Sequence, residues 1–103
     1  MAQLRLRLLG GFELHNASGE PVTLPPKKAR ALLAYLALTG GRPQSRDRLA
    51  ALLWEDADER QARTSLRQAL TAIRTSLPDA DARVLHAGIE TVRLDTSAME
   101  VDV

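Results

Sequence analysis

The segment from Glu59 to Leu77 (ERQARTSLRQALTAIRTSL) constrains the fold of this chain most, because it carries two different stripes at the same helical spacing. One stripe is apolar, and the other combines arginine with a hydroxyl side chain. A helix built this way buries one face in a core and presents the other face outward. The apolar stripe consists of Leu66, Leu70, Ile73 and Leu77, and the polar stripe consists of Arg63, Arg67, Thr71 and Arg74.

A row of guanidinium and hydroxyl groups on a helix suits the major groove of DNA, where base edges offer hydrogen-bond donors and acceptors. A plain solvated face is the alternative, because a groove-reading helix has no stricter signature than this one. Cations near helix starts and groove edges are typical of contacts to the phosphate backbone. The predicted base-reading residues are Arg63, Thr64, Arg67, Gln68 and Thr71. The predicted backbone contacts from this pattern are Lys27, Lys28, Arg46 and Arg74.

The distribution of charge is more informative than the net charge of +1. Residues 27–48 carry six cations and one acid, and residues 60–77 carry four arginines and no acid. An acidic segment separates them, since residues 49–59 hold four acids and no base. Two basic blocks in 103 residues, a length typical of one domain, indicate a polarised surface.

Catalysis and metal binding gain no support from the sequence. There is no cysteine, and the two histidines, His15 and His86, lie far apart at no metal-ligand spacing. The glycines form no phosphate-binding loop. From these absences together we predict no enzyme activity, no catalytic residue, no metal and no cofactor. No signal peptide or membrane-spanning run is present, which predicts a soluble, cytoplasmic protein without a membrane partner.

The two ends of the chain have the alternating pattern of strands, and the middle has helical spacing. Residues 4–8 and 12–14 predict two strands joined through Gly10 and Gly11, and 21–24 predicts a short returning strand. Helices are expected after Pro26, after Ser45 as an N-cap, and after Asp58 as an N-cap paired with Gln61. Residues 83–87 and 91–95 predict a hairpin, with Val92 facing inward.

Strands, three helices and a hairpin, in that order, are the plan of a winged helix-turn-helix. The predicted class is therefore α+β, with an N-terminal antiparallel sheet, a three-helix bundle and a C-terminal β-hairpin wing. In such folds the third helix enters the major groove and the wing reaches toward the backbone or the minor groove.

Five segments, in this order, resemble the N-terminal domain of the actinobacterial antibiotic-pathway activators known as the SARP family, whose DNA-binding part is an OmpR-type winged helix. The segments cover nearly the whole chain. They are LRLLGGFEL (within 4–14), PVTLPPKKARALLAYLAL (21–38), GRPQSRDRLAALLW (41–54), ARTSLRQALTAIRTSL (62–77) and TVRLD (91–95).

The resemblance implies sequence-specific binding of double-stranded DNA at direct repeats near promoters, as a side-by-side dimer that recruits RNA polymerase. It places Glu55, Asp56 and Asp58 in a loop that faces RNA polymerase. These activators continue into an all-helical domain, so residues 1–103 are expected to be a single winged-helix domain excised from a longer regulator.

The expected wing tip, Gly88-Ile89-Glu90, departs from the pattern because it carries no cation. One possibility is that Arg83 or Arg93 contacts the DNA backbone instead, and Arg93 is the residue assigned to this contact. The other is that the wing contributes little to DNA binding. A protein-interaction module that keeps the winged-helix fold without binding DNA is the alternative function.

Overall fold

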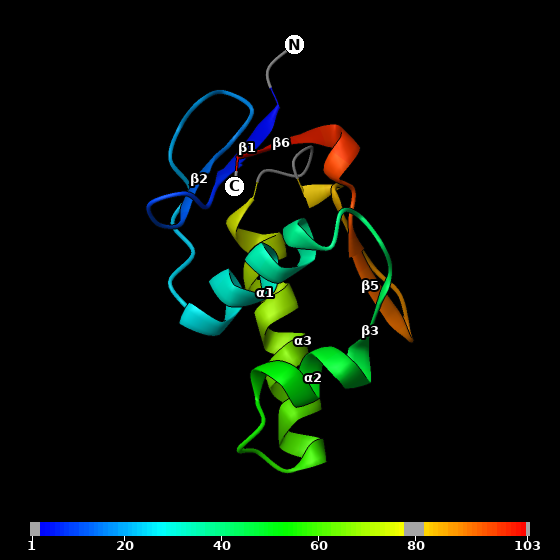
Figure 1. Ribbon diagram of the computed structural model, residues 1–103. Coiled ribbons are helices and arrows are strands. Elements are labelled where there is room, and N and C mark those ends of the chain that lie inside the picture. Colours follow the sequence, from blue (N-terminus) through cyan, green and yellow to red (C-terminus); the bar gives the residue numbers. More distant parts are fainter. Residues whose placement is uncertain (1–2, 78–81, 103) are drawn as a thin grey trace.

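A computed structural model describes residues 3–77 and 82–102 of the chain. Three helices lie between two small sheets, and the long third helix runs through the centre of the molecule (Figure 1). This arrangement confirms the predicted α+β winged helix with its C-terminal hairpin. The β1–β2 pair confirms the antiparallel start of the first sheet.

The first sheet contains strands from both ends of the chain, in the order β2-β1-β6. Strand β1 (Leu4–Arg7) pairs antiparallel with β2 (Glu13–His15) and parallel with β6 (Met99–Asp102). The sequence pattern did not predict β6. Because β6 pairs parallel with β1, the sheet is mixed where an antiparallel one was expected. Ion pairs between Arg5 and Glu100 (2.9 Å) and between Arg7 and Asp102 (3.6 Å) cross the parallel pairing on its outer face.

The returning strand predicted at 21–24 is wrong in extent. Only Pro21 forms a β-bridge, to His15, and the residues after it are not in a strand. Proline has no backbone N–H to donate to a ladder, and three prolines in six residues (Pro21, Pro25 and Pro26) limit the pairing. Leu24 is nevertheless buried in the core.

The helices begin close to the predicted positions. They are α1 (Lys27–Leu38), α2 (Arg46–Leu53) and α3 (Glu59–Ser76). The side chain of Ser45 accepts a hydrogen bond from the Arg48 backbone N–H at 3.3 Å, and Asp58 accepts one from the Gln61 backbone N–H at 2.8 Å. Both predicted N-caps are confirmed. Gly40, with a φ of 67°, adopts the left-handed conformation that ends α1.

The second sheet has the order β3-β5-β4 and contains the wing. Strands β4 (Leu85–Ala87) and β5 (Thr91–Leu94) form the predicted antiparallel hairpin, and Val92 faces inward as expected. The third strand, β3 (Gln44–Ser45), pairs with β5 immediately before α2 begins. A strand of two residues has no alternating pattern, which is why the sequence did not predict it.

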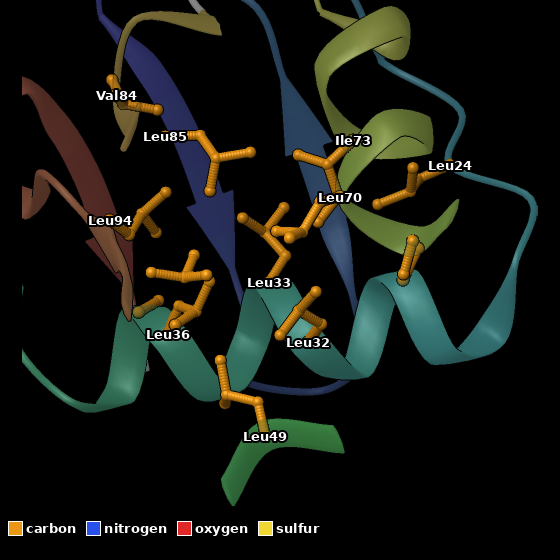
Figure 2. Close-up of a cluster of buried hydrophobic side chains, with 14 of the residues drawn as sticks. Leu24, Leu32, Leu33, Leu36, Leu49, Leu70, Ile73, Val84, Leu85 and Leu94 are labelled. Atoms are coloured by element: carbon orange, nitrogen blue, oxygen red, sulfur yellow. The ribbon is translucent and has the colours of Figure 1, made fainter. Parts of the chain in front are cut away.

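The core lies where α1 faces α3 and the two sheets (Figure 2). Leu32, Leu33 and Leu36 of α1 point toward Leu70 and Ile73 of α3 and toward the strands. The leucine stripe of α3 is therefore buried as predicted, and its opposite face is left outward. None of the helices in the described part of the chain is long and apolar enough to cross a membrane.

Candidate nucleic-acid interface

Helix α3 exposes one continuous polar face. Ala62, Leu66 and Ile73 on its other face are buried against α1 and α2. Asp58 caps the first turn, and Glu59 in that turn lies at the positive end of the helix dipole. The apolar side and the cap of the helix thus fix its position in the fold.

Four of the predicted contact residues on α3 are exposed and make no hydrogen bond or ion pair with any residue that the structure describes. They are Arg67, Gln68, Thr71 and Arg74. Arg67, Thr71 and Arg74 follow one another at spacings of four and three residues, so they form a row along the helix. These side chains offer guanidinium, amide and hydroxyl groups to a ligand with no internal partner to displace.

The other two predicted base-reading residues are engaged within the protein. The guanidinium of Arg63 forms ion pairs with Glu59, one turn earlier, and with Asp47 of α2 at 3.6 Å. The hydroxyl of Thr64 donates to the Arg60 carbonyl at 3.1 Å, and Thr64 is half-buried. Both residues lie on or beside the exposed face, and both must give up or share these partners to contact a base.

The two lysines at the start of α1 differ in their surroundings. Lys27 is exposed and has no partner in the described residues. Lys28 donates from Nζ to the Leu53 carbonyl at 2.6 Å, at the last residue of α2. A helix C-terminus carries unsatisfied carbonyls and partial negative charge, so Lys28 satisfies and neutralises that end. Lys28 therefore joins α1 to α2.

Arg46 joins the start of α2 to the wing. Its Nε donates to the Gly88 carbonyl at 2.7 Å, and its backbone N–H donates to the Glu90 carbonyl at 2.9 Å. Arg93 lies in β5, half-buried, opposite His86 of β4. Two of the predicted backbone contacts thus lie on or against the wing.

Two exposed cations were missed by the sequence analysis. The guanidinium groups of Arg60, in the first turn of α3, and of Arg48, in the first turn of α2, have no partner among residues 3–77 and 82–102. Arg60 could have been found from its spacing, because it precedes Arg67 by seven residues and so lies on the same side of the helix. With Arg67 and Arg74 it gives α3 three arginines without an internal partner.

The loop between α2 and α3 is acidic and borders a groove. Glu55 and Asp56 are exposed, whereas Asp58 is the N-cap of α3. A groove of about 350 Å³ lies beside the loop, with an apolar floor and acidic edges. Its lining consists of Asp47, Ala50, Ala51, Trp54, Glu55, Ala57, Glu59, Ala62 and Arg63.

Residues 19–94 match the family model described as transcriptional regulatory protein, C terminal. The chain is also similar to the structure of Mycobacterium tuberculosis EmbR in complex with a low-affinity phosphopeptide, with 32% sequence identity and a TM-score of 0.77. The similarity covers 96% of this chain and 27% of the EmbR chain, so this chain spans about a quarter of that length. No curated protein matches it in sequence.

Proposed function

Because the chain belongs to the family of C-terminal domains of transcriptional regulatory proteins, the OmpR-type winged helix to which the SARP regulators also belong, we propose that it binds a specific sequence of double-stranded DNA. Helix α3 lies in the major groove in this proposal. The observation that carries it is the exposed row on α3, whose side chains have no partner in the described part of the chain. The family is one of DNA-binding regulatory domains and not of enzymes.

Base reading is assigned to the exposed face of α3. The guanidinium of Arg67 suits the two acceptors of guanine, and the amide of Gln68 suits the donor and acceptor of adenine. Thr71 offers a hydroxyl to either kind of base edge and a methyl group to thymine. Arg63 and Thr64 join them when DNA replaces their internal partners, and phosphate competition favours the release of Arg63 from Glu59.

Contacts to the phosphate backbone are assigned to cations around this face. Lys27 and Arg74 are exposed and bring a full positive charge without an internal partner in the described residues. Three further cations also have a place in the fold: Lys28 and Arg46 each donate to a backbone carbonyl, and Arg93 is half-buried in β5. In this proposal they contact phosphate through the N–H groups that remain free. Such contacts fix the position of the domain on the duplex and carry no sequence information themselves.

The wider role proposed is that of a bacterial transcriptional activator acting in the cytoplasm, where the chromosome lies. The domain then binds direct repeats near promoters as a dimer formed on DNA. The loop with Glu55, Asp56 and Asp58 faces RNA polymerase in the longer regulator of which residues 1–103 are the DNA-binding domain. Glu55, which is exposed and lines the groove beside this loop, supports the last assignment because it offers a carboxylate to a basic partner.

Selection from a pool of randomised duplexes tests the proposal, followed by fluorescence anisotropy on the selected duplex at several salt concentrations. Enrichment of one sequence, with affinity that falls steeply as salt rises, is the expected result, since bound cations release counterions from DNA. Weak binding without any enriched sequence contradicts it. That outcome favours the alternative, a winged-helix module that contacts protein instead of DNA.

A further inference from the structure

We propose that Ile89, at the tip of the wing, contacts the floor of the DNA minor groove and selects A·T pairs there by an apolar contact. This inference rests on the proposed function, since it requires that the domain bind duplex DNA. It assigns to the wing a role in specificity that does not depend on a cation at its tip.

Ile89 is the most exposed of the large hydrophobic side chains in the described residues, with 95% of its surface accessible. Its neighbours in the turn, Gly88 and Glu90, add no apolar side chain to it. A docking surface for another protein needs several neighbouring apolar side chains. A single isoleucine at the end of a narrow hairpin has the shape of a wedge that enters a groove.

The tip is held in place by the rest of the fold. The Gly88 N–H donates to the Thr91 carbonyl at 2.8 Å and closes the turn. Arg46 then fastens both the Gly88 and the Glu90 carbonyls to the start of α2, at 2.7 and 2.9 Å. A tip fixed in this way presents Ile89 at little further cost in conformational entropy when DNA binds.

The start of α2 also connects the tip to the helix proposed to read the major groove. Arg46 contacts the wing tip, and the next residue, Asp47, forms an ion pair with Arg63 of α3 at 3.6 Å. Strands β3 and β5 of the second sheet lie beside the α2 end of the molecule (Figure 1). The wing tip and the first turns of α3 therefore flank the same helix start, and in this proposal they enter neighbouring grooves of one duplex.

The chemistry of the tip favours the groove floor over the backbone. Ile89 has no polar group that could bind a phosphate oxygen, so the tip gains nothing from resting on the sugar-phosphate chain. The floor of the minor groove lacks a protruding group at A·T pairs, whereas guanine places its N2 amino group there. Ile89 therefore packs against the groove floor at A·T pairs. At G·C pairs the guanine N2 amino group either blocks Ile89 or is buried beside it without a hydrogen-bond acceptor. Arg93, which lies opposite His86 across the stem, supplies a cation nearer the groove edge.

The test uses the selected duplex with a single binding site, altered only in the base pairs next to the α3 footprint. Three versions carry A·T, G·C or inosine·cytosine pairs there. Inosine lacks the N2 amino group, so its pair with cytosine has the minor groove of A·T and the major groove of G·C. The wild-type domain is expected to bind the A·T and inosine versions alike, and the G·C version about fivefold or more weakly.

Ile89→Ala is expected to remove this preference, so that all three duplexes bind equally, without changing the slope of log Kd against log salt. Leu38→Ala is the matched control, because Leu38 is also an exposed large hydrophobic residue but ends α1. It should keep the preference of the wild type. Thermal unfolding of both variants checks that the fold is intact, as expected for exposed side chains.

Two results overturn the assignment of Ile89 while leaving the proposed function standing. One is that Ile89→Ala keeps the wild-type preference for A·T and inosine pairs. The other is that it lowers affinity only on duplexes with two sites, which would make its partner a second copy of the chain. If the wild-type domain binds no selected duplex at all, the proposed function fails and this inference fails with it.

Discussion

Asp47 Oδ1 lies 3.6 Å from Nε of Arg63 and joins the first turn of α2 to the first turns of α3. The same guanidinium also pairs with Glu59 of its own helix. All three side chains are exposed, so the pairs add little to stability. Their effect is on Arg63, which two carboxylates hold before any DNA arrives. A residue predicted to read bases is thereby kept in a defined position and partly neutralised.

Replacing Asp47 by asparagine (Asp47→Asn) is expected to strengthen DNA binding at low salt. The change removes a negative charge beside the proposed phosphate contacts and frees Arg63 from one of its partners. The free energy of unfolding should fall by less than about 1 kcal/mol, as for other exposed pairs. Anisotropy titrations at two salt concentrations measure the first effect. Asp102→Asn, which removes an acid from the first sheet, serves as the control, and an unchanged affinity for both variants would contradict the prediction.

Arg67→Ala should weaken specific binding by about 1–3 kcal/mol and relax the preference at one base position, if Arg67 pairs with guanine. Arg67 is exposed and has no partner in the part of the chain described, so its removal leaves the fold unchanged. Competition between the selected duplex and single-base variants measures both effects. Arg5→Ala removes the same charge from the first sheet and should change no base preference. A variant that binds and discriminates like the wild type removes Arg67 from the readout.

The neighbouring residues Lys27 and Lys28 are expected to differ in how much each contributes to stability. Lys28→Ala leaves the Leu53 carbonyl without its Nζ partner and should lower the free energy of unfolding by about 1 kcal/mol. Lys27→Ala should leave stability within about 0.5 kcal/mol of the wild type and reduce the salt slope of DNA binding by about 1. Urea unfolding and salt titration give the two readouts. Equal stability of the two variants would show that the Lys28 contact contributes nothing.

Asp95 provides a prediction on pH. The side-chain hydroxyl of Ser97 donates to Asp95 Oδ1 at 2.6 Å, and this bond is the main reason that the pKa of Asp95 lies below its ordinary value. A carboxyl whose pKa is lower in the folded state stabilises the fold above its unfolded pKa, about 4, and loses that contribution as pH falls through the folded pKa. Ser97→Ala should therefore raise the pKa of Asp95.

Titration of the Asp95 carboxyl by NMR measures this shift. Ser18→Ala, a change in the exposed loop after β2, is the control and should leave the pKa of Asp95 where the wild type has it. If the pKa of Asp95 stays the same in Ser97→Ala, the hydroxyl is not its cause.

The sequence predicted most of the helical part of the fold because each helix carries its own evidence. In α3 the apolar stripe sets the buried face, and Asp58 marks the first residue to within one position. The wing hairpin was predicted from the alternation on both sides of Gly88. The bounds of these elements depend on residues that are neighbours in sequence, so the pattern of one sequence is enough to predict them.

Pairings between distant residues could not be predicted in the same way. Met99–Asp102 has no run of alternating apolar residues long enough to indicate a strand, and it becomes one because β1 offers a free edge. The partners of Lys28 and Arg46 are backbone carbonyls, which every residue carries, so no side-chain pattern points to them. Exposure was predictable from periodicity, and the particular partner was not.

The central position of β1 between β2 and β6 has a consequence for the order in which the domain forms during synthesis. Arg5 and Glu100, which meet across that pairing, are 95 positions apart. The ribosome has therefore released all three helices and the wing before β1 obtains its second neighbour. The strand made first therefore completes its hydrogen bonding last. Pairing β1 with β6 closes a loop of nearly the whole chain, and this entropic cost is larger than that of the contacts between helices, which are closer in sequence.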